Sequence, residues 1–196
     1  MLAIEYKKID AEDIELNRYE VSRRLNVSKD FEMEEINECL KKLKKVTKCG
    51  FSSVCVPVKY LEEGHLDLGF GVFKSDTLTK NLKGCPKAFI FAVTLGMEVD
   101  RLLNKLSRLS PSQYFITDAL ASALADAAAD KAEEILKNGL LCRPRFSPGF
   151  GDLSLDLQPR ILGILNAQKL LGITINTSRL MSPKKSVTAI MGIKNE

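Results

Sequence analysis

Tryptophan is absent from this sequence, histidine occurs once, and no apolar run approaches the length of a membrane span. A spanning helix needs about 20 consecutive apolar residues, so no membrane segment is predicted. Acidic and basic residues stand at the N-terminus, where a signal peptide has an apolar run, and we therefore expect a cytoplasmic protein. The single histidine, His65, excludes histidine-rich metal sites, and a Ser-His-Asp triad would have to use it. We expect it at the surface or at the end of a strand.

Cysteine is present, but not in the patterns that build cross-links or metal sites. The five cysteines are Cys39, Cys49, Cys55, Cys85 and Cys142. Their number is odd, they are widely spaced, and no two form a CxxC pair. This spacing favours reduced thiols that pack in the interior over a disulfide framework or a zinc site.

Charge is also spread in a way that argues against nucleic-acid binding. The formal net charge is +4, but the 29 basic residues are dispersed among 25 acidic ones. The densest basic run, residues 41–45, alternates with apolar residues at helical spacing, which is typical of a solvated helix face. RNA-binding surfaces combine basic residues with exposed aromatic residues, and this chain is only 7% aromatic. We expect no nucleic-acid partner.

The first half of the chain changes from a helical to a strand-like pattern. With 196 residues, of which 45% are hydrophobic, the chain has the composition of one globular domain, residues 1–196. Asp10 is positioned to cap a helix that ends near Leu25, and Ser28 to cap one that ends near Val46, so the part from about 1 to 48 is predicted to be helical. Alternation from residue 51 to 73 predicts an antiparallel hairpin that turns at 62–64.

The second half alternates strands with longer helices. We predict an α+β fold in which an antiparallel sheet of four to six strands carries flanking helices. The predicted helices span 75–82, 98–109, 111–137 and 157–171, and the predicted strands span 88–94, 173–175 and 186–193. The helix at 111–137 is rich in alanine, which favours close packing against another backbone. Asp126 and Asp130 share one face of it and could meet a cation if that face borders a pocket.

The segment from Arg143 to Asp152 is the strongest candidate for a binding loop. It holds two arginines, two prolines, two glycines and two phenylalanines. Arg145 could hold a carboxylate through two charge-assisted hydrogen bonds, Gly149 allows close approach of a ligand, and Phe150 offers an aromatic face. A second interpretation is equally open from the residues: a rigid connector whose arginine is paired with Asp152 or Asp156.

Two motifs favour the binding interpretation. The run Arg145-Phe-Ser-Pro-Gly-Phe resembles the Arg-x-x-Pro-Gly-Tyr signature of the S-adenosylmethionine-binding activation domain of cobalamin-dependent methionine synthase. The segment 172–187 resembles the second block of that family, with Ser178, Met181, Pro183, Ser186 and Val187 in its Ser-x-x-Met-x-Pro-x-x-Ser-Val positions. These matches cover about the last 50 residues. The alanine-rich helix corresponds to one that carries a ligand-side acid in the family.

The resemblance implies a role for each matching residue. Arg145 would bind the ligand carboxylate, the backbone of Pro148, Gly149 and Phe150 the nucleotide, and Asp126 a polar group, in a ligand-binding part of about residues 110–196; Ser178 belongs to the second block. Three departures stand out. Phe150 replaces the usual tyrosine, residues 176–177 are Asn-Thr instead of Thr-Glu, and the N-terminal acid that contacts the ligand ammonium in the family has no counterpart.

The implied function is that of an accessory activation subunit without a complete active site of its own. It would bind S-adenosylmethionine and support reductive remethylation of cobalamin carried by a partner, either methionine synthase or a related corrinoid methyltransferase. The electron donor would be of the flavodoxin or ferredoxin type. The alternative is a docking or chaperone subunit for a corrinoid protein that has lost methyl transfer. A different kind of methyltransferase is less consistent with the sequence, which lacks the Gly-rich strand-to-helix loop of a Rossmann-like enzyme.

Overall fold

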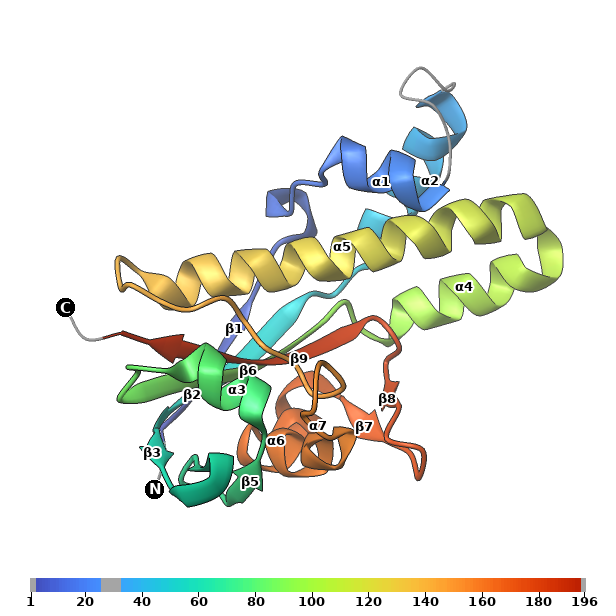
Figure 1. Ribbon diagram of the computed structural model, residues 1–196. Coiled ribbons are helices and arrows are strands. Elements are labelled where there is room, and N and C mark those ends of the chain that lie inside the picture. Colours follow the sequence, from blue (N-terminus) through green and yellow to red (C-terminus); the bar gives the residue numbers. More distant parts are fainter. Residues whose placement is uncertain (1–2, 26–32, 195–196) are drawn as a thin grey trace.

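A four-stranded antiparallel sheet forms the centre of the computed structural model, which describes residues 3–25 and 33–194 (Figure 1). The strand order is β1-β2-β6-β9, and every neighbouring pair is antiparallel. The strands are β1 (Ile4–Lys8), β2 (Gly50–Pro57), β6 (Lys87–Thr94) and β9 (Ser186–Ile193). Segments from both ends of the chain therefore meet in one sheet. The second motif, residues 172–187, ends in β9 and is thereby placed beside β6 from the first half of the chain.

One face of this sheet is covered by the longer helices, which lie above it in Figure 1. They are α1 (Arg18–Leu25), α2 (Met33–Val46), α4 (Met97–Leu109) and α5 (Pro111–Lys137). Phe51, Phe91 and Met191 point into this layer and are fully buried. The alanine-rich face of α5 packs there too, with Ala121, Ala128 and similar small residues buried, and removing this apolar area from water stabilises the layer.

The opposite face carries shorter elements. Side chains alternate along the strands, so Val54, Val56 and Ile90 enter a second core on this side. Its helices are α3 (Asp76–Leu82), α6 (Gln158–Ile164) and α7 (Ala167–Leu171). Two small antiparallel sheets complete the layer, one of β3 (Lys59–Tyr60), β4 (His65–Asp67) and β5 (Val72–Lys74), the other of β7 (Thr174–Ile175) and β8 (Met181–Ser182). The α+β architecture predicted from the sequence is confirmed.

Several predicted elements are also confirmed. Proline stands in the first turn of α5 and Asn138 ends the helix in the left-handed conformation, as helix signals prefer. The Ser75 hydroxyl accepts a hydrogen bond from the Leu78 amide and caps α3.

None of the helices in residues 3–25 and 33–194 combines the length and apolar character that crossing a bilayer requires.

The N-terminal prediction is wrong in its first part. Residues 4–8 form the edge strand β1 instead of belonging to a helical region, and their side chains are exposed. Asp10 does cap a helical turn, but this is a short 3-10 helix at Ala11–Asp13, and α1 begins only at Arg18. Ile4 and Tyr6 do alternate with Glu5 and Lys7, but over four residues only, the shortest run that indicates a strand. The predicted cap Ser28 lies outside the described residues.

Two further predictions need correction. β2 does not form a hairpin with the next strand; it pairs with β1 and β6, and the turn at Glu62–Gly64 joins β3 to β4. The helix predicted at 157–171 is divided into α6 and α7, because Asn166 adopts a left-handed conformation between them. Alternation predicts the faces of a strand but not its partner, which explains the first error.

Candidate functional site

The loop that contains Arg145 is attached to the free edge of the central sheet. After α5 the chain turns back beneath the helix and runs beside β9 (Figure 1). The Phe146 amide donates to the Ile190 carbonyl, and the Ile190 amide donates back, both at 2.8 Å. The Arg143 amide donates to the Gly192 carbonyl at 2.8 Å. Phe146 packs against the second core, so its neighbour Arg145 is directed to the opposite side, toward α5.

Arg145 is held by two acids of α5. Its Nη1 atom donates to Asp130 Oδ1 and to Glu133 Oε1, the latter at 2.5 Å. Burial of the guanidinium works against its charge, but the hydrogen bonds with Asp130 and Glu133 outweigh burial and raise the pKa of Arg145. The Nε and Nη2 atoms make no hydrogen bond within the described chain, and the side chain is 26% exposed. One edge of the guanidinium is thus fixed and the other is available.

Asp126, one turn earlier on the same face of α5, is paired with a different arginine. Arg24 Nη2 on α1 donates to Asp126 Oδ2 at 2.5 Å. Lys185, in the turn before β9, similarly contacts Asp118 Oδ1 at 2.8 Å on an earlier turn of α5. The exposed stripe of α5 is therefore acidic, and each of these acids meets a cation from another part of the chain.

The tip of the loop is a series of tight turns. The Gly149 amide donates to the Leu153 carbonyl at 2.8 Å and the Phe150 amide to the Ser147 carbonyl at 3.2 Å. Pro148 is buried, while the Phe150 ring is 66% exposed. The carbonyl oxygens of Pro148 and Gly149 accept no hydrogen bond from the described residues. The tip thus has an exposed aromatic face and two carbonyls that lack partners among the described residues.

Asp152 anchors the loop to α3. Its carboxylate accepts hydrogen bonds from the Ser75 hydroxyl at 2.6 Å, from the Asp76 amide at 2.7 Å, and from the hydroxyl and amide of Thr77. These bonds, those of Ser75 and Thr77 foremost, hold the pKa of Asp152 well below its usual range. The interpretation in which Asp152 or Asp156 pairs with Arg145 is wrong. Asp152 accepts its hydrogen bonds from the start of α3, and Asp156 pairs with Arg179.

The anchor should be sensitive to acid. A carboxylate whose pKa is lowered on folding stabilises the native state above its unfolded pKa of about 4 and loses that contribution as the pH falls below it. We expect wild-type protein to melt at a higher temperature than Asp152→Asn at pH 7, with the gap closing below about pH 4. Melting followed by circular dichroism across this pH range checks the prediction, and a gap independent of pH would contradict it.

Gly151 is required by the backbone of the loop. Its φ is +56°, and a Cβ atom there would lie 2.6 Å from the Thr77 hydroxyl oxygen. Alanine at this position should cost about 1–2 kcal/mol from the left-handed conformation alone, and the crowding of Thr77 adds to this. Gly163→Ala is the matched control, because Gly163 lies in α6 with nothing within 4 Å of its Cβ position. That control should stabilise by about 0.5–1 kcal/mol in urea unfolding; equal effects of the two substitutions would refute the prediction.

The second motif forms a hairpin and a turn below α4 and α5. Ser178 lies at the exposed tip between β7 and β8 and makes no hydrogen bond within the described chain. Its neighbour Arg179 donates from Nε to Asp156 Oδ1 at 3.0 Å, which connects the tip to the segment that follows the Arg145 loop. The Lys184 amide donates to Asp100 Oδ2 at 2.9 Å. The two motifs are therefore near in structure, although Ser178 itself contacts neither Arg145 nor Phe150 through a hydrogen bond.

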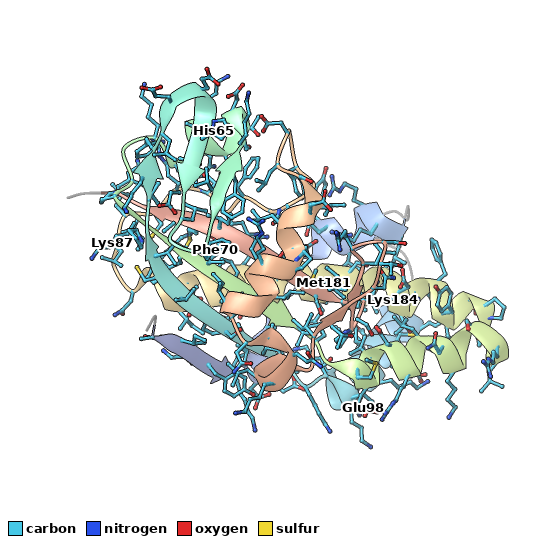
Figure 2. All side chains as sticks on the ribbon, turned by 90° about the horizontal axis from the view of Figure 1, so that it is seen from below. His65, Phe70, Lys87, Glu98, Met181 and Lys184 are labelled. Carbon is cyan, nitrogen blue, oxygen red and sulfur yellow. The ribbon has the colours of Figure 1, made fainter. Side chains whose placement is uncertain are left out.

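Groups associated with acid–base or metal chemistry lie elsewhere. Figure 2 shows His65 on the small sheet, away from Met181 and Lys184. His65 stands at the start of β4, as expected for a strand-end residue. None of the five cysteines forms a disulfide, and burial raises the pKa of Cys49 to about 12, so this thiol stays protonated. The described residues contain no group of His, Cys, Asp and Glu that could hold a metal ion.

A shallow hollow elsewhere on the surface is separate from these residues. It lies on the outer face of α4 and is lined by Arg101, Asn104, Lys105, Arg108 and Leu109. None of them belongs to the Arg145 loop or to the second motif. The candidate site is accordingly the open surface between the loop and α5.

Sequence reasoning missed two participants in this site. Helical spacing places Glu133, seven residues after Asp126, on the same face of α5, but it does not show that this face meets Arg145. Arg24 carries no such signal, because only the packing of α1 on α5 brings it to Asp126.

No family model matches the chain, and the curated proteins contain no match either. Comparison with solved structures shows that the fold is of the reactivation-domain type. One matching structure is the MetH reactivation domain bound to AdoHcy, with a TM-score of 0.76. The alignment covers 97% of this chain and 78% of that one, at 16% sequence identity. At this identity the likeness establishes the fold, and the function has to be argued from the residues.

Proposed function

We propose that this chain binds S-adenosylmethionine on the surface between the Arg145 loop and α5. The observation that carries the proposal is the guanidinium of Arg145, whose Nη1 is fixed by Asp130 and Glu133 while Nε and Nη2 remain without protein partners. A fixed arginine edge suits a carboxylate, because two parallel charge-assisted bonds form with little loss of side-chain freedom. The similarity to a domain bound to AdoHcy supports the same ligand class.

The loop tip suits the other end of such a ligand. The carbonyls of Pro148 and Gly149 are free acceptors for the exocyclic amino group of adenine. The exposed ring of Phe150 offers a face to the nucleotide or to the sulfonium, which rings attract through their quadrupole. The missing tyrosine hydroxyl removes a hydrogen-bonding group but leaves this face in place.

The proposed role of binding is to support reductive remethylation of cobalamin on a partner protein. A one-electron donor of the flavodoxin or ferredoxin type reduces the partner's cob(II)alamin to cob(I)alamin. The methyl group then passes from the sulfonium sulfur to the cobalt, the carbon–sulfur bond breaks, and S-adenosylhomocysteine is released. The sulfonium is already a good leaving group, so this chain contributes orientation and proximity instead of acid–base catalysis.

Methyl transfer tests the proposal directly. The chain is mixed with S-adenosylmethionine labelled in its methyl group, a reductant, and a methionine synthase fragment that carries cob(II)alamin but has no activation domain. We expect labelled methylcobalamin to form only when this chain is present, and to fall strongly with Arg145→Ala. Transfer at the same rate without the chain would contradict the proposal.

One observation favours the alternative of a docking subunit that no longer transfers methyl groups. Both charged side chains assigned to the ligand, Arg145 and Asp126, are already in ion pairs within the chain. A ligand must then share or replace these partners, which weakens binding. The two functions separate cleanly: the docking subunit would bind the cobalamin protein with no measurable affinity for S-adenosylmethionine.

A further inference from the structure

An arginine of α1 lies against α5, beside the place where the ligand's amino-acid end would bind. Arg24 comes from α1, which packs on α5 through the buried side chains of Val21 and Leu25. Its Nη2 atom contacts Asp126, and its side chain is 29% exposed. Nothing in the family resemblance assigns this residue a role.

Arg24 also has a hydrogen-bond donor that is not used. Its Nε atom is buried and has no partner among the described residues. A buried donor without an acceptor is costly, and such groups in native proteins usually meet water or a ligand. The Nε and Nη2 atoms form one edge of the guanidinium, so the unused donor lies directly beside the bond to Asp126.

The two arginines lie one helical turn apart along α5. Arg24 pairs with Asp126, and Arg145 pairs with Asp130, which is four residues further on. Residues four apart in a helix are neighbours on its surface. Two cations and three carboxylates, those of Asp126, Asp130 and Glu133, therefore lie within a small area. This arrangement complements a zwitterion, because the cations face a carboxylate and the acids face an ammonium group.

We propose that Arg24 is a specificity-determining residue that binds the carboxylate of the ligand's amino-acid end together with Arg145, while Asp126 and Asp130 receive the ammonium group. The inference rests on the proposed function and adds to it a contact between Arg24 and the ligand carboxylate. It also accounts for the missing N-terminal acid: the N-terminal part of this chain contributes a cation to the amino-acid end, and α5 supplies the acids.

Two ligands that differ only at this end give the test. S-adenosylhomocysteine carries the amino-acid group, and 5′-methylthioadenosine lacks it while retaining the adenosine and the thioether. Binding of each is measured by calorimetry with wild type, Arg24→Gln and Arg24→Lys. Arg23→Gln is the matched control, because Arg23 is the adjacent arginine, is 65% exposed and pairs with Glu20 on its own helix.

We expect both Arg24 variants to bind S-adenosylhomocysteine about 10-fold more weakly or worse, with binding of 5′-methylthioadenosine and the control variant unchanged. Lysine keeps the charge near Asp126 but lacks the planar fork, so Arg24→Lys carries the test if the glutamine variant does not fold. Equal losses for both ligands would overturn the inference, since Arg24 would then act through the placement of α1.

Unchanged binding of S-adenosylhomocysteine by the Arg24 variants would also overturn the inference. Tighter binding would overturn it too, because Arg24 would then compete with the ammonium group for Asp126. The proposed function fails in a different way. In that case wild-type protein binds neither S-adenosylmethionine nor S-adenosylhomocysteine. If wild type binds them and Arg145→Ala does not, while the Arg24 variants behave like wild type, only the role of Arg24 is lost.

Discussion

Replacing Arg145 with alanine should weaken S-adenosylmethionine binding by about 10- to 150-fold, the equivalent of about 1.5–3 kcal/mol for hydrogen bonds to a charged group. The physical reason lies in the arrangement of its donors. Asp130 and Glu133 hold Nη1, so the free edge is fixed before a ligand arrives. Calorimetric titration measures the loss. Arg145→Lys should recover only part of it, because an ammonium group cannot make the two parallel bonds.

Arg101→Ala is the control for charge in this experiment. Arg101 lies on α4, is 69% exposed and pairs with Glu98 one turn away. The substitution removes one positive charge, as Arg145→Ala does, but outside the candidate site. The affinity of Arg101→Ala for S-adenosylmethionine should therefore match that of wild type. A comparable loss in Arg101→Ala would mean that overall charge, and not the Arg145 contact, governs binding.

The largest effect on stability is expected for Phe91→Ala. Phe91 is in β6 at the middle of the sheet, fully buried against the helical layer. Truncating a buried phenylalanine removes apolar contact and leaves a cavity, at a cost of about 3–5 kcal/mol. This is a large fraction of the roughly 5–15 kcal/mol that stabilises a typical domain. Urea unfolding followed by circular dichroism measures the change.

Phe115→Ala is the matched substitution for that experiment. Phe115 is in α5, but 57% of it is exposed, so its loss should change stability by about 0.5 kcal/mol or less. If the two substitutions cost the same free energy, the assignment of Phe91 to the core between sheet and helices is incorrect.

The parts of the fold that are encoded locally could be predicted from the sequence. The bounds of α5 follow from Pro111 in its first turn and the left-handed residue after Lys137. β6 and β9 are recognisable as apolar strands. The alternation in the edge strand β1 covers only four residues, and its side chains are exposed, so its pairing with β2 provides the main evidence for a strand. The partner of β2 was equally inaccessible, since strand pairing is a tertiary property.

The candidate site divides in the same way. The crowded arginine, proline, glycine and phenylalanine residues make the Arg145 loop a candidate, and its resemblance to the Arg-x-x-Pro-Gly-Tyr signature favours binding over a rigid connector. Its true partners, Asp130 and Glu133, required knowledge that the chain returns along α5 to pair with β9. The sequence predicts that Asp126 contacts the ligand, and in the structure its carboxylate accepts a hydrogen bond from Arg24. Long-range ion pairs of this kind leave no periodic trace in a sequence.

The central claim is that the wild-type chain binds S-adenosylmethionine, and direct calorimetric titration of that ligand into the folded protein tests it most directly. Saturable binding at one site per chain, displaced by S-adenosylhomocysteine, is the result predicted by the open edge of Arg145 and the unpaired carbonyls of the loop tip. No detectable heat and no shift in melting temperature, in protein whose circular dichroism shows it to be folded, would contradict the claim and leave the docking subunit as the surviving function.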